Sequence, residues 1–375
     1  MHDRHNNTAD VSGVQRVAIV GTGSVARLHV EALRALPDVA IVAAVDSVPG
    51  RAAEFASIYG IARSFSSVEE LLDAEQLDIV HLCTPPSGHA AQAIAVLARG
   101  AHVVVEKPPA LSLAELERML AAAAANGRQL AVVFQQRTGS AAAAVKRMLD
   151  SGTLGRPLVA TCHTLWYREQ EYFDVPWRGT WQGEGGGTTF SHGIHQIDLL
   201  AYLLGDWAGA SGTLWRQDRE VETEDVSIGT VRFTSGAVAS VVTSAVSPRQ
   251  TSSIRIDTDK ATIELDHLYG HARANWKLTP APHVSEADVA GWTLPIEDQP
   301  SSHEALIRAL YAGFRTGAAL PDVVSAPTRA FEIVSALYAS ARLGSEVTPQ
   351  LLRTDRVFSE GNRSTVTDTR RSRHG

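Results

Sequence analysis

Apolar residues in the first third of the chain gather in short runs rich in β-branched side chains, and helical patterns separate these runs. The runs cover residues 16–20, 39–45, 61–65, 78–83, 101–105 and 129–134. Between the first two, apolar residues recur at helical spacing at Val25, Leu28, Ala32 and Leu36. Apolar strands that alternate with helices are typical of a parallel sheet covered on both faces. Residues 14–138 are therefore predicted to form a doubly wound α/β domain.

The pattern changes after residue 155. Strand-like runs then follow at 159–165, 209–215, 226–233, 238–246, 253–257 and 261–265, mostly joined by short turns. Helical patterns cover 303–316 and 328–343. Consecutive strands of this kind predict an α+β domain with an open, largely antiparallel sheet over residues 139–353. Its late helices could pack back on the first domain, and residues 1–13 and 354–375 are expected to be disordered tails.

A glycine-rich turn joins the first strand to the first helix, with the sequence Gly21-Thr22-Gly23-Ser24-Val25-Ala26. Gly21 permits the tight turn, Gly23 lets a pyrophosphate approach the backbone, and Ala26 allows close packing of helix on strand. The phosphates would lie at the helix N-terminus. The turn predicts a Rossmann dinucleotide site, although an ordinary glycine turn has the same residues.

An acidic residue, Asp46, ends the second strand. It follows the glycine turn by about 20 residues, which is where a ribose-binding carboxylate belongs. Such a carboxylate accepts hydrogen bonds from the ribose hydroxyls and repels a 2′-phosphate. Asp46 therefore favours NAD as the cofactor, while Arg51 nearby leaves NADP open.

Glu106 and Lys107 directly follow three valines and precede a prolyl pair that must end the strand. They are therefore predicted to lie at the carboxyl end of a buried strand, where open α/β sheets bind ligands. A lysine is rarely placed there for packing alone. The turn after the neighbouring strand lines the same crevice with Thr84, Pro85, Pro86 and His89.

A helix is predicted to begin at the glycines 185–187. On its helical wheel, one apolar stripe is formed by Phe190, Ile194, Ile197, Ala201 and Leu204. Beside it lies a polar stripe of Ser191, His195, Asp198 and Tyr202. The polar stripe fits either hydrogen-bonded packing or a functional site. His192 points about 60° away from His195 on this wheel, which makes it the weaker candidate.

Aromatic residues are concentrated just before this helix. Six of the 23 aromatic residues lie within residues 166–181: Trp166, Tyr167, Tyr172, Phe173, Trp177 and Trp181. Aromatic faces can cover the C–H face of a sugar ring, but the same side chains suit a subunit interface, and both interpretations stay open. Arg168 and Arg178 could clamp a carboxylate or phosphate, or stack on the rings.

Composition narrows the class of protein. The chain has 375 residues, enough for two domains, and its net charge of −7 argues against a nucleic-acid partner. No apolar run approaches the ~18 residues that a membrane span needs, and residues 1–12 lack the apolar core of a signal peptide. Cys83 and Cys162 fit neither a disulfide framework nor a metal pattern, which favours free thiols in a reducing cytoplasm and no bound metal.

These motifs together resemble the Gfo/Idh/MocA family of NAD(P)-dependent sugar oxidoreductases. The resemblance runs from Val17 to about Leu351 and also includes His29 and the late helix at 331–344. It implies a Rossmann domain followed by an α/β domain whose open sheet often mediates oligomerisation. The expected partners are a small sugar, polyol or glycoside and further copies of the chain, as a homodimer or homotetramer.

The resemblance also implies roles. Lys107 would hydrogen-bond the substrate oxygen, and His195 would take the hydroxyl proton while hydride passes to the nicotinamide. Ser191 stands where many members have an aspartate that orients the histidine, so it should raise the basicity of His195 less. The expected cofactor contacts are the glycine turn, Asp46, Arg51, Thr84, Pro85, Pro86, His89, Glu106 and Lys107. The expected substrate contacts are Lys107, Trp166, Tyr167, Arg168, Arg178, Trp181, His192, His195 and Asp198.

Two alternative functions remain at the level of sequence, an NAD-dependent glycosidase of the same fold and a non-catalytic NAD sensor. The sequence further predicts an oligomer interface on the open sheet. Residues 226–231 and 238–243 alternate apolar with small side chains and carry no lysine or glutamate. Ser227, Gly229, Ala239 and Val241 are candidates for an outer face that would suit a matching sheet.

Overall fold

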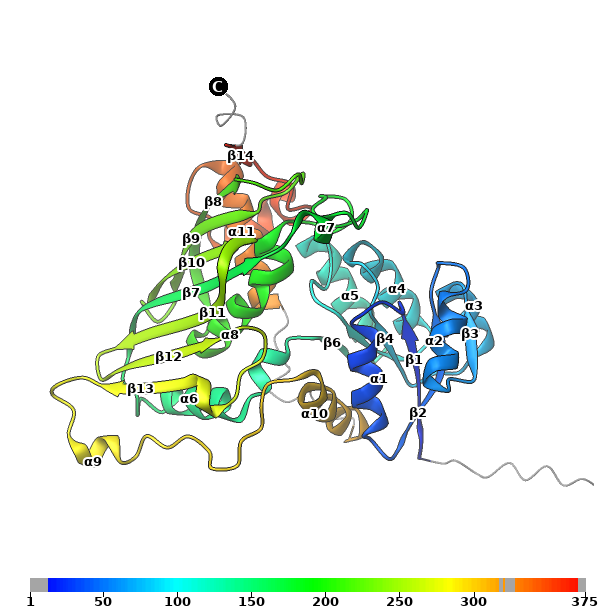
Figure 1. Ribbon diagram of the computed structural model, residues 1–375, viewed down its shortest axis with the longest axis horizontal. Helices are drawn as coiled ribbons and strands as arrows, with labels where there is room; N and C mark the ends of the chain where they lie inside the picture. Colours follow the sequence, from blue (N-terminus) through cyan, green and yellow to red (C-terminus); the bar gives the residue numbers. More distant parts are fainter. Residues whose placement is uncertain (1–12, 317–319, 321–327, 370–375) are drawn as a thin grey trace, which may run out of the picture.

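The computed structural model describes residues 13–316, 320 and 328–369 and contains two sheets (Figure 1). The first is a six-stranded parallel sheet in the order β3-β2-β1-β4-β5-β6. Its strands are β1 (Gln15–Val20), β2 (Val39–Val45), β3 (Arg63–Phe65), β4 (Ile79–Leu82), β5 (His102–Val105) and β6 (Leu130–Val132). The strand order reverses between β1 and β4, so the turns that follow these two strands open onto one crevice. The predicted doubly wound domain is confirmed.

Helices cover this sheet, and their ends follow local capping rules. They are α1 (Ala26–Arg34), α2 (Arg51–Tyr59), α3 (Val68–Ala74), α4 (Pro86–Ala98) and α5 (Leu113–Ala125). At the start of α5, Ser112 Oγ accepts the Glu115 N–H at 3.2 Å, and the Glu115 carboxylate accepts the Leu111 N–H at 2.9 Å. This reciprocal pair fixes where the helix begins.

The second sheet has eight strands in the order β13-β12-β11-β7-β10-β9-β8-β14. Its strands are β7 (Pro157–Tyr167), β8 (Trp207–Arg216), β9 (Val226–Phe233), β10 (Val238–Ser244), β11 (Val246–Thr258), β12 (Ala261–His267), β13 (Trp276–Pro280) and β14 (Thr367–Asp368). Only the β7–β10 and β8–β14 pairs are parallel among the described strand pairs of this sheet. One face packs against α8 (Ile194–Leu204) and α11 (Thr328–Leu343). The predicted open, largely antiparallel sheet is confirmed.

The outer face of this sheet carries other residues than expected. Ser227, Gly229, Ala239 and Val241 are buried on the helix side, whereas Ile228 is 50% and Val238 44% exposed. The small residues are explained by helix packing, because a Cβ on Gly229 would lie 2.6 Å from Leu337 Cδ2 of α11. The alternation was correct, but the assignment of its faces was wrong, since neighbouring strand residues point to opposite faces.

The C-terminal segment is also more ordered than expected. It forms α12 (Pro349–Thr354), α13 (Arg356–Ser359) and β14, so the predicted disorder is wrong for residues 354–369. Phe358 is buried in the core, and the Asn362 amide donates to the Leu111 carbonyl at 3.2 Å. These long-range contacts order a segment that has no regular apolar period. The tails at 1–12 and 370–375 lie outside the described residues.

Three more helices, which the sequence pattern did not reveal, are α6 (Ser140–Asp150), α7 (Gln170–Phe173) and α9 (Glu286–Val289). The helix α10 (His303–Thr316) returns to the first domain and lies beside α1 (Figure 1). Its apolar residues pack on β1 and α1 through Leu306, Ile307, Leu310, Tyr311 and Phe314. Among the described residues, no helix combines the length and apolar character needed to cross a membrane.

Candidate active site

The glycine turn after β1 has the geometry of a dinucleotide cradle. Gly21 has φ +87°, and a Cβ there would lie 2.7 Å from the Cys83 carbonyl and the Thr84 nitrogen. A Cβ on Gly23 would meet nothing within 4 Å, so the backbone is open on that side. The start of α1 has neither a side-chain cap nor an acidic residue in its first turn. A helix N-terminus without such groups suits a pyrophosphate. The predicted turn also includes Thr22, Ser24, Val25 and Ala26.

Asp46 lies at the end of β2 and faces this turn. Its Oδ2 accepts the N–H of Thr22 at 2.9 Å and the Thr22 hydroxyl at 2.8 Å, while Oδ1 accepts the Val48 N–H at 2.9 Å. Burial alone would raise the pKa of Asp46, but these hydrogen bonds and Arg51, 3.8 Å away, outweigh it and lower the pKa. Asp46 is therefore an anion at the place predicted for the ribose.

The turn after β4 is held from beneath by His89. Its ring nitrogens lie 2.9 Å from the Pro108 carbonyl and 2.8 Å from the Thr84 carbonyl, and the side chain is fully buried. His89 thus ties together the turns that follow β4 and β5. Pro85 and Pro86 begin α4, which leaves the Thr84 side of the turn at the crevice.

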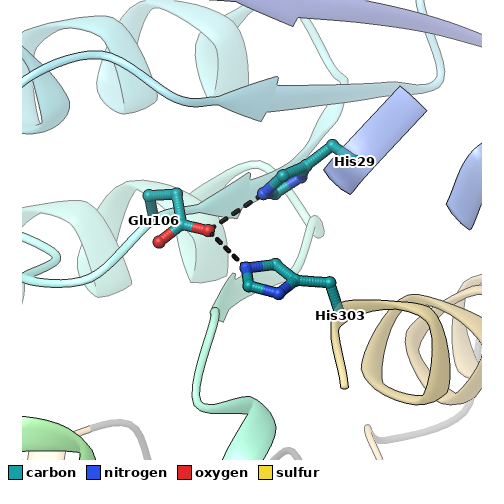
Figure 2. Close-up of side chains that lie close together, drawn as sticks. All are labelled: His29, Glu106 and His303. Atoms are coloured by element: carbon teal, nitrogen blue, oxygen red, sulfur yellow. Dashed lines mark hydrogen bonds and ion pairs between the residues drawn. The ribbon is translucent and has the colours of Figure 1, made fainter. Parts of the chain in front are cut away.

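Glu106, the residue before Lys107, is bound by two histidines. Figure 2 shows its carboxylate between His29 of α1 and His303 at the start of α10. Its Oε1 lies 3.0 Å from His29 Nε2 and 3.1 Å from His303 Nε2, and Oε2 accepts the Lys107 N–H at 3.1 Å. Burial would raise the pKa of Glu106, but the bonds from both histidines outweigh it and hold the pKa well below its ordinary range.

A hydrogen-bond chain continues from His29 into the interior. His29 Nδ1 lies 2.7 Å from His81 Nδ1, and His81 Nε2 lies 2.9 Å from the Tyr311 hydroxyl. Burial lowers the pKa of both histidines, so both are neutral near pH 7. One assignment satisfies every atom: Tyr311 donates to His81, His81 to His29, and His29 to ionised Glu106.

The sequence analysis missed His81, His303 and Tyr311. A histidine inside the apolar strand β4 was an available signal for the first of them. Ligand atoms of His29, Glu106 and His303 lie within 4.8 Å of one another, a spacing that could also hold a metal ion. The hydrogen bonds account for the same convergence. Glu106 therefore anchors the base of Lys107 rather than lining an open surface.

Lys107 extends from the end of β5 toward the second domain. Its Nζ donates to the Ser191 carbonyl at 2.9 Å. Burial lowers the pKa of Lys107, while the carboxylates of Glu106 and Glu184 raise it. The ammonium thus lies where the cofactor domain meets the helix that carries His195.

That helix begins with a π-helical turn, η2 (Thr189–Gly193), before α8. The Ser191 hydroxyl donates to the Gly187 carbonyl at 2.9 Å and lies 3.2 Å from His192 Nδ1, so the histidine that it contacts is His192 rather than His195. Because a π turn is wider than an α turn, the polar stripe does not keep one direction. Asp198 is fully buried and bound through both oxygens by Arg137, so it belongs to the packing beneath α8.

His195 is a buried polar side chain without hydrogen-bond partners among the described residues. It is 2% exposed, and neither ring nitrogen has a hydrogen-bond partner. Burial and then the Lys107 charge hold its pKa well below the ordinary range, so the imidazole is neutral. Leaving such a buried group unpaired costs about 1–3 kcal/mol, which is characteristic of functional positions.

The aromatic loop (residues 166–181) places several of the predicted side chains around His192. The Tyr172 hydroxyl lies 3.1 Å from His192 Nε2, and the Trp166 ring centroid lies 5.0 Å from that of His192. Arg178 Cζ lies 3.7 Å and Arg168 Cζ 5.4 Å from the Tyr172 ring centroid. His192 therefore lies in one cluster with Trp166, Tyr172, Arg168 and Arg178, although the α-helical wheel made it the weaker candidate.

Two predicted aromatic contacts lie elsewhere. Trp181 packs edge-on against Tyr338 of α11, with ring centroids 5.9 Å apart. The Arg219 guanidinium lies over Tyr167, and its Cζ is 5.0 Å from the Tyr167 ring centroid. Neither ring shares a contact with the His192 cluster in the described part of the chain, so the substrate roles expected for them have no support in this geometry.

Glu184 is an acidic residue that the sequence analysis missed, although its position directly before three glycines was a signal. It is 2% exposed, and its Oε2 accepts the Gly179 N–H at 2.7 Å. Burial raises its pKa to about 7, even though Arg178 and Lys107 oppose the shift. Glu184 therefore brings a titratable carboxyl close to both cations.

Comparison with known families identifies the two halves of the chain. The model of the oxidoreductase family with an NAD-binding Rossmann fold matches residues 15–134, and that of the Gfo/Idh/MocA C-terminal domain matches residues 142–264. The chain belongs to the Gfo/Idh/MocA family. Its first domain is accordingly an NAD-binding domain, which agrees with the open cradle at Gly23.

Individual relatives of this Gfo/Idh/MocA protein are sugar dehydrogenases. It is 29% identical to D-glucoside 3-dehydrogenase of Escherichia coli over 287 residues, covering 70% of this chain and 80% of the relative. It is 27% identical to D-apiose dehydrogenase of Paraburkholderia graminis over 345 residues, covering 88% of both chains. The WlbA dehydrogenase of Bordetella pertussis, solved with NADH and UDP-GlcNAcA, superposes with a TM-score of 0.79 at 26% identity, over 89% of this chain and 98% of the other.

Proposed function

We propose that this protein is an NAD-dependent dehydrogenase or reductase acting on a secondary alcohol of a sugar, an inositol or a glycoside. The observation that carries the proposal is His195, a buried neutral imidazole with two unpaired nitrogens in the region of the Lys107 ammonium. Both groups lie where the NAD-binding domain meets the second domain. The names of the sugar dehydrogenases to which the chain is similar support the same class of reaction.

NAD, when bound, supplies a hydride acceptor in one direction and a hydride donor in the other. Lys107 has three N–H donors and uses one on the Ser191 carbonyl, so it can also bind the substrate oxygen. Its positive charge stabilises that oxygen most as negative charge develops. His195 accepts the hydroxyl proton through a ring nitrogen as the carbonyl forms, and returns it in the reverse direction.

The test is NADH absorbance with a panel of polyols, aldoses and glycosides. Lys107→Ala should lower kcat at least about 100-fold while the Kd for NAD stays within about threefold. His195→Ala should lower kcat by about 100- to 10,000-fold. Matched controls are Lys277→Ala and His283→Ala, two exposed side chains of the second domain outside this cluster.

Each other outcome has a meaning. Failure to bind either nicotinamide cofactor, or unchanged turnover in both site variants, would overturn the proposal. Glycoside cleavage without net NADH would identify the alternative glycosidase. Tight NAD binding without turnover of any panel member, in either direction, would favour the sensor.

A further inference from the structure

Two arginines of the aromatic loop, Arg178 and Arg168, pack on the Tyr172 ring, and neither has a carboxylate partner among the described residues. Arg178 Cζ lies 3.7 Å and Arg168 Cζ 5.4 Å from the Tyr172 ring centroid. Within the described part of the chain, no acidic oxygen lies within 4.0 Å of either guanidinium. Arg178 Nε is buried and has no hydrogen-bond partner. Arg168 donates through one terminal nitrogen to the Tyr167 carbonyl at 2.9 Å and to Gln250 Oε1 at 3.3 Å. A guanidinium has five N–H donors, so both arginines keep donors for a further ligand.

Both arginines also lie near the proposed catalytic lysine, Lys107. Both lower the pKa of Lys107, after the larger effect of its burial, so the three cations lie close enough to repel one another. At His192, burial lowers the pKa most, and the permanent charges that add to this shift are all cationic: Arg168, Lys107 and Arg178.

The nearby acids do not balance this charge. Glu106 is engaged by His29 and His303, and Glu184, whose pKa burial raises to about 7, is only partly ionised at neutral pH. Arg168 and Arg178 are partly buried and Lys107 is more deeply buried, so their excess positive charge is costly unless a ligand supplies an anion. The excess therefore points to a ligand with a negative charge.

We propose that the substrate is an anionic sugar, with a carboxylate or phosphate bound by Arg178 and Arg168 and its reacting alcohol at Lys107 and His195. The inference rests on the proposed function and adds the substrate's charge to it. A guanidinium presents paired N–H donors that match the oxygens of either anion. Tyr172 contacts both arginines through its ring and His192 through its hydroxyl, so it connects the proposed anion site to the helix that carries His195.

The experiment compares neutral and anionic partners that share a ring: D-glucose with D-glucuronate and D-glucose 6-phosphate, and D-galactose with D-galacturonate. We expect kcat/KM with NAD to be at least about tenfold higher for an anionic member than for its neutral partner. Arg178→Gln and Arg168→Gln should each lower that ratio about 10- to 100-fold. Arg178→Lys, which keeps the charge but loses the fork, should lower it less.

Arg99→Gln is the matched control, because Arg99 is exposed at the end of α4 and paired with Asp73. It should leave the ratio unchanged. The glucuronate and phosphate arms show which anion fits better, and preference for either supports the proposal. A neutral partner that is preferred throughout, or a ratio unaffected by both glutamine variants, would overturn it.

Ligand-induced shifts in melting temperature separate this inference from the proposed function. An arginine-dependent shift with the anionic sugars but no NADH would retain the anion site and reject the dehydrogenase. NADH formation from neutral sugars, without an arginine-dependent shift from any anionic one, would retain the dehydrogenase and reject the anion site. The wild-type comparison stays decisive even if an arginine variant fails to fold.

Discussion

Single side chains set the charges of this crevice through their hydrogen bonds. Asp46 stays ionised because Thr22 and Val48 donate to it, and Glu106 stays ionised because two histidines do. His195 has no such partner and is neutral. The same physical rule therefore produces both fixed anions and a free base within one site.

Asp46 makes a prediction about cofactor choice. A carboxylate that binds ribose hydroxyls repels a 2′-phosphate, so NADH should bind at least about tenfold more tightly than NADPH. Asp46→Ala should remove most of this preference and weaken NADH binding about tenfold. Fluorescence titration with both reduced cofactors measures the two Kd values.

The control for this titration is Asp73→Ala, whose carboxylate pairs with Arg99 on the surface. It should leave both affinities unchanged. Equal affinities of the wild type for NADH and NADPH would contradict the role given to Asp46 but not the dinucleotide site itself.

At the scale of elements, the glycines before α8 are required by close packing. A Cβ on Gly187 would lie 2.0 Å from the Glu224 carbonyl oxygen, and one on Gly186 would lie 2.6 Å from the Tyr338 hydroxyl. The Gly187 N–H donates to Glu224 at 3.1 Å and to Tyr338 at 3.0 Å. The turn is thus held by the segment that precedes β9 and by α11, which both come later in the chain.

Gly187→Ala should therefore lower the free energy of unfolding by at least about 3 kcal/mol, because the Glu224 backbone would have to move. Gly23→Ala, with open space around its Cβ, should barely change stability but should weaken NADH binding. Urea denaturation and NADH titration measure the two effects.

Gly361→Ala is the control for both measurements, since nothing lies within 4 Å of its Cβ and it is outside the crevice. A Gly187→Ala variant as stable as the wild type would show that the Glu224 backbone can move to make room for a Cβ. The claim that the close approach requires glycine at position 187 would then be refuted.

Local signals were enough to predict most elements from the sequence. Most strands of the first sheet follow from their apolar, β-branched runs, and the start of α5 depends on the neighbouring Ser112 cap. Other features depend on neighbours distant in sequence. The π turn redirects Ser191 and Asp198, and the packing of α11 decides which face of β9 is buried.

The candidate site was predictable to a similar extent. Lys107 and the glycine turn are visible because motifs of fixed spacing carry them. Glu184 and His303 could not be placed, because the first acts through burial and the second arrives from a helix in the other half of the chain.

Across the whole molecule, buried neutral histidines make stability depend on pH. Burial lowers the pKa of seven largely buried histidines, to about 3 for His267 and about 4 for His271, with His29, His81, His89, His192 and His195 shifted in the same direction. Below pH 6.5 the unfolded chain binds protons at these positions and the folded chain does not. Each therefore lowers the free energy of unfolding by up to ~1.4 kcal/mol per pH unit.

Three buried acids act in the opposite direction, because burial raises the pKa of Asp198, Glu184 and Glu224 above their unfolded values. The histidines outnumber them. Between pH 7.5 and 5.5 the free energy of unfolding should fall by about 3 kcal/mol or more, which urea titrations at each pH can measure. Recovery at pH 7.5 controls for irreversible damage, and a flat or rising profile would contradict the neutral assignment.

The outer face of the second sheet supports the predicted oligomer through different residues. Thr213, Ile228, Val242, His163 and Ser253 form one row across five strands, and none carries a permanent charge. Light scattering should give a multiple of the 40.1 kDa chain mass, and Ile228→Arg should reduce it toward one chain. Ile58→Arg on α2, 67% exposed, is the control and should not change the mass. A monomeric wild type would reject the interface.

Because α10 packs on the first domain, the chain cannot be divided between its two sheets without separating residues that contact each other. A fragment ending at residue 138 would expose the apolar surface of α1 and leave Glu106 without His303. Such a fragment should precipitate or bind NADH poorly, and adding back residues 303–316 through a short linker should restore its solubility. Exchanging the first 138 residues between relatives would likewise separate helices that depend on each other. The two halves of the chain should therefore be exchanged together, because α10 of the second half completes the packing of the first.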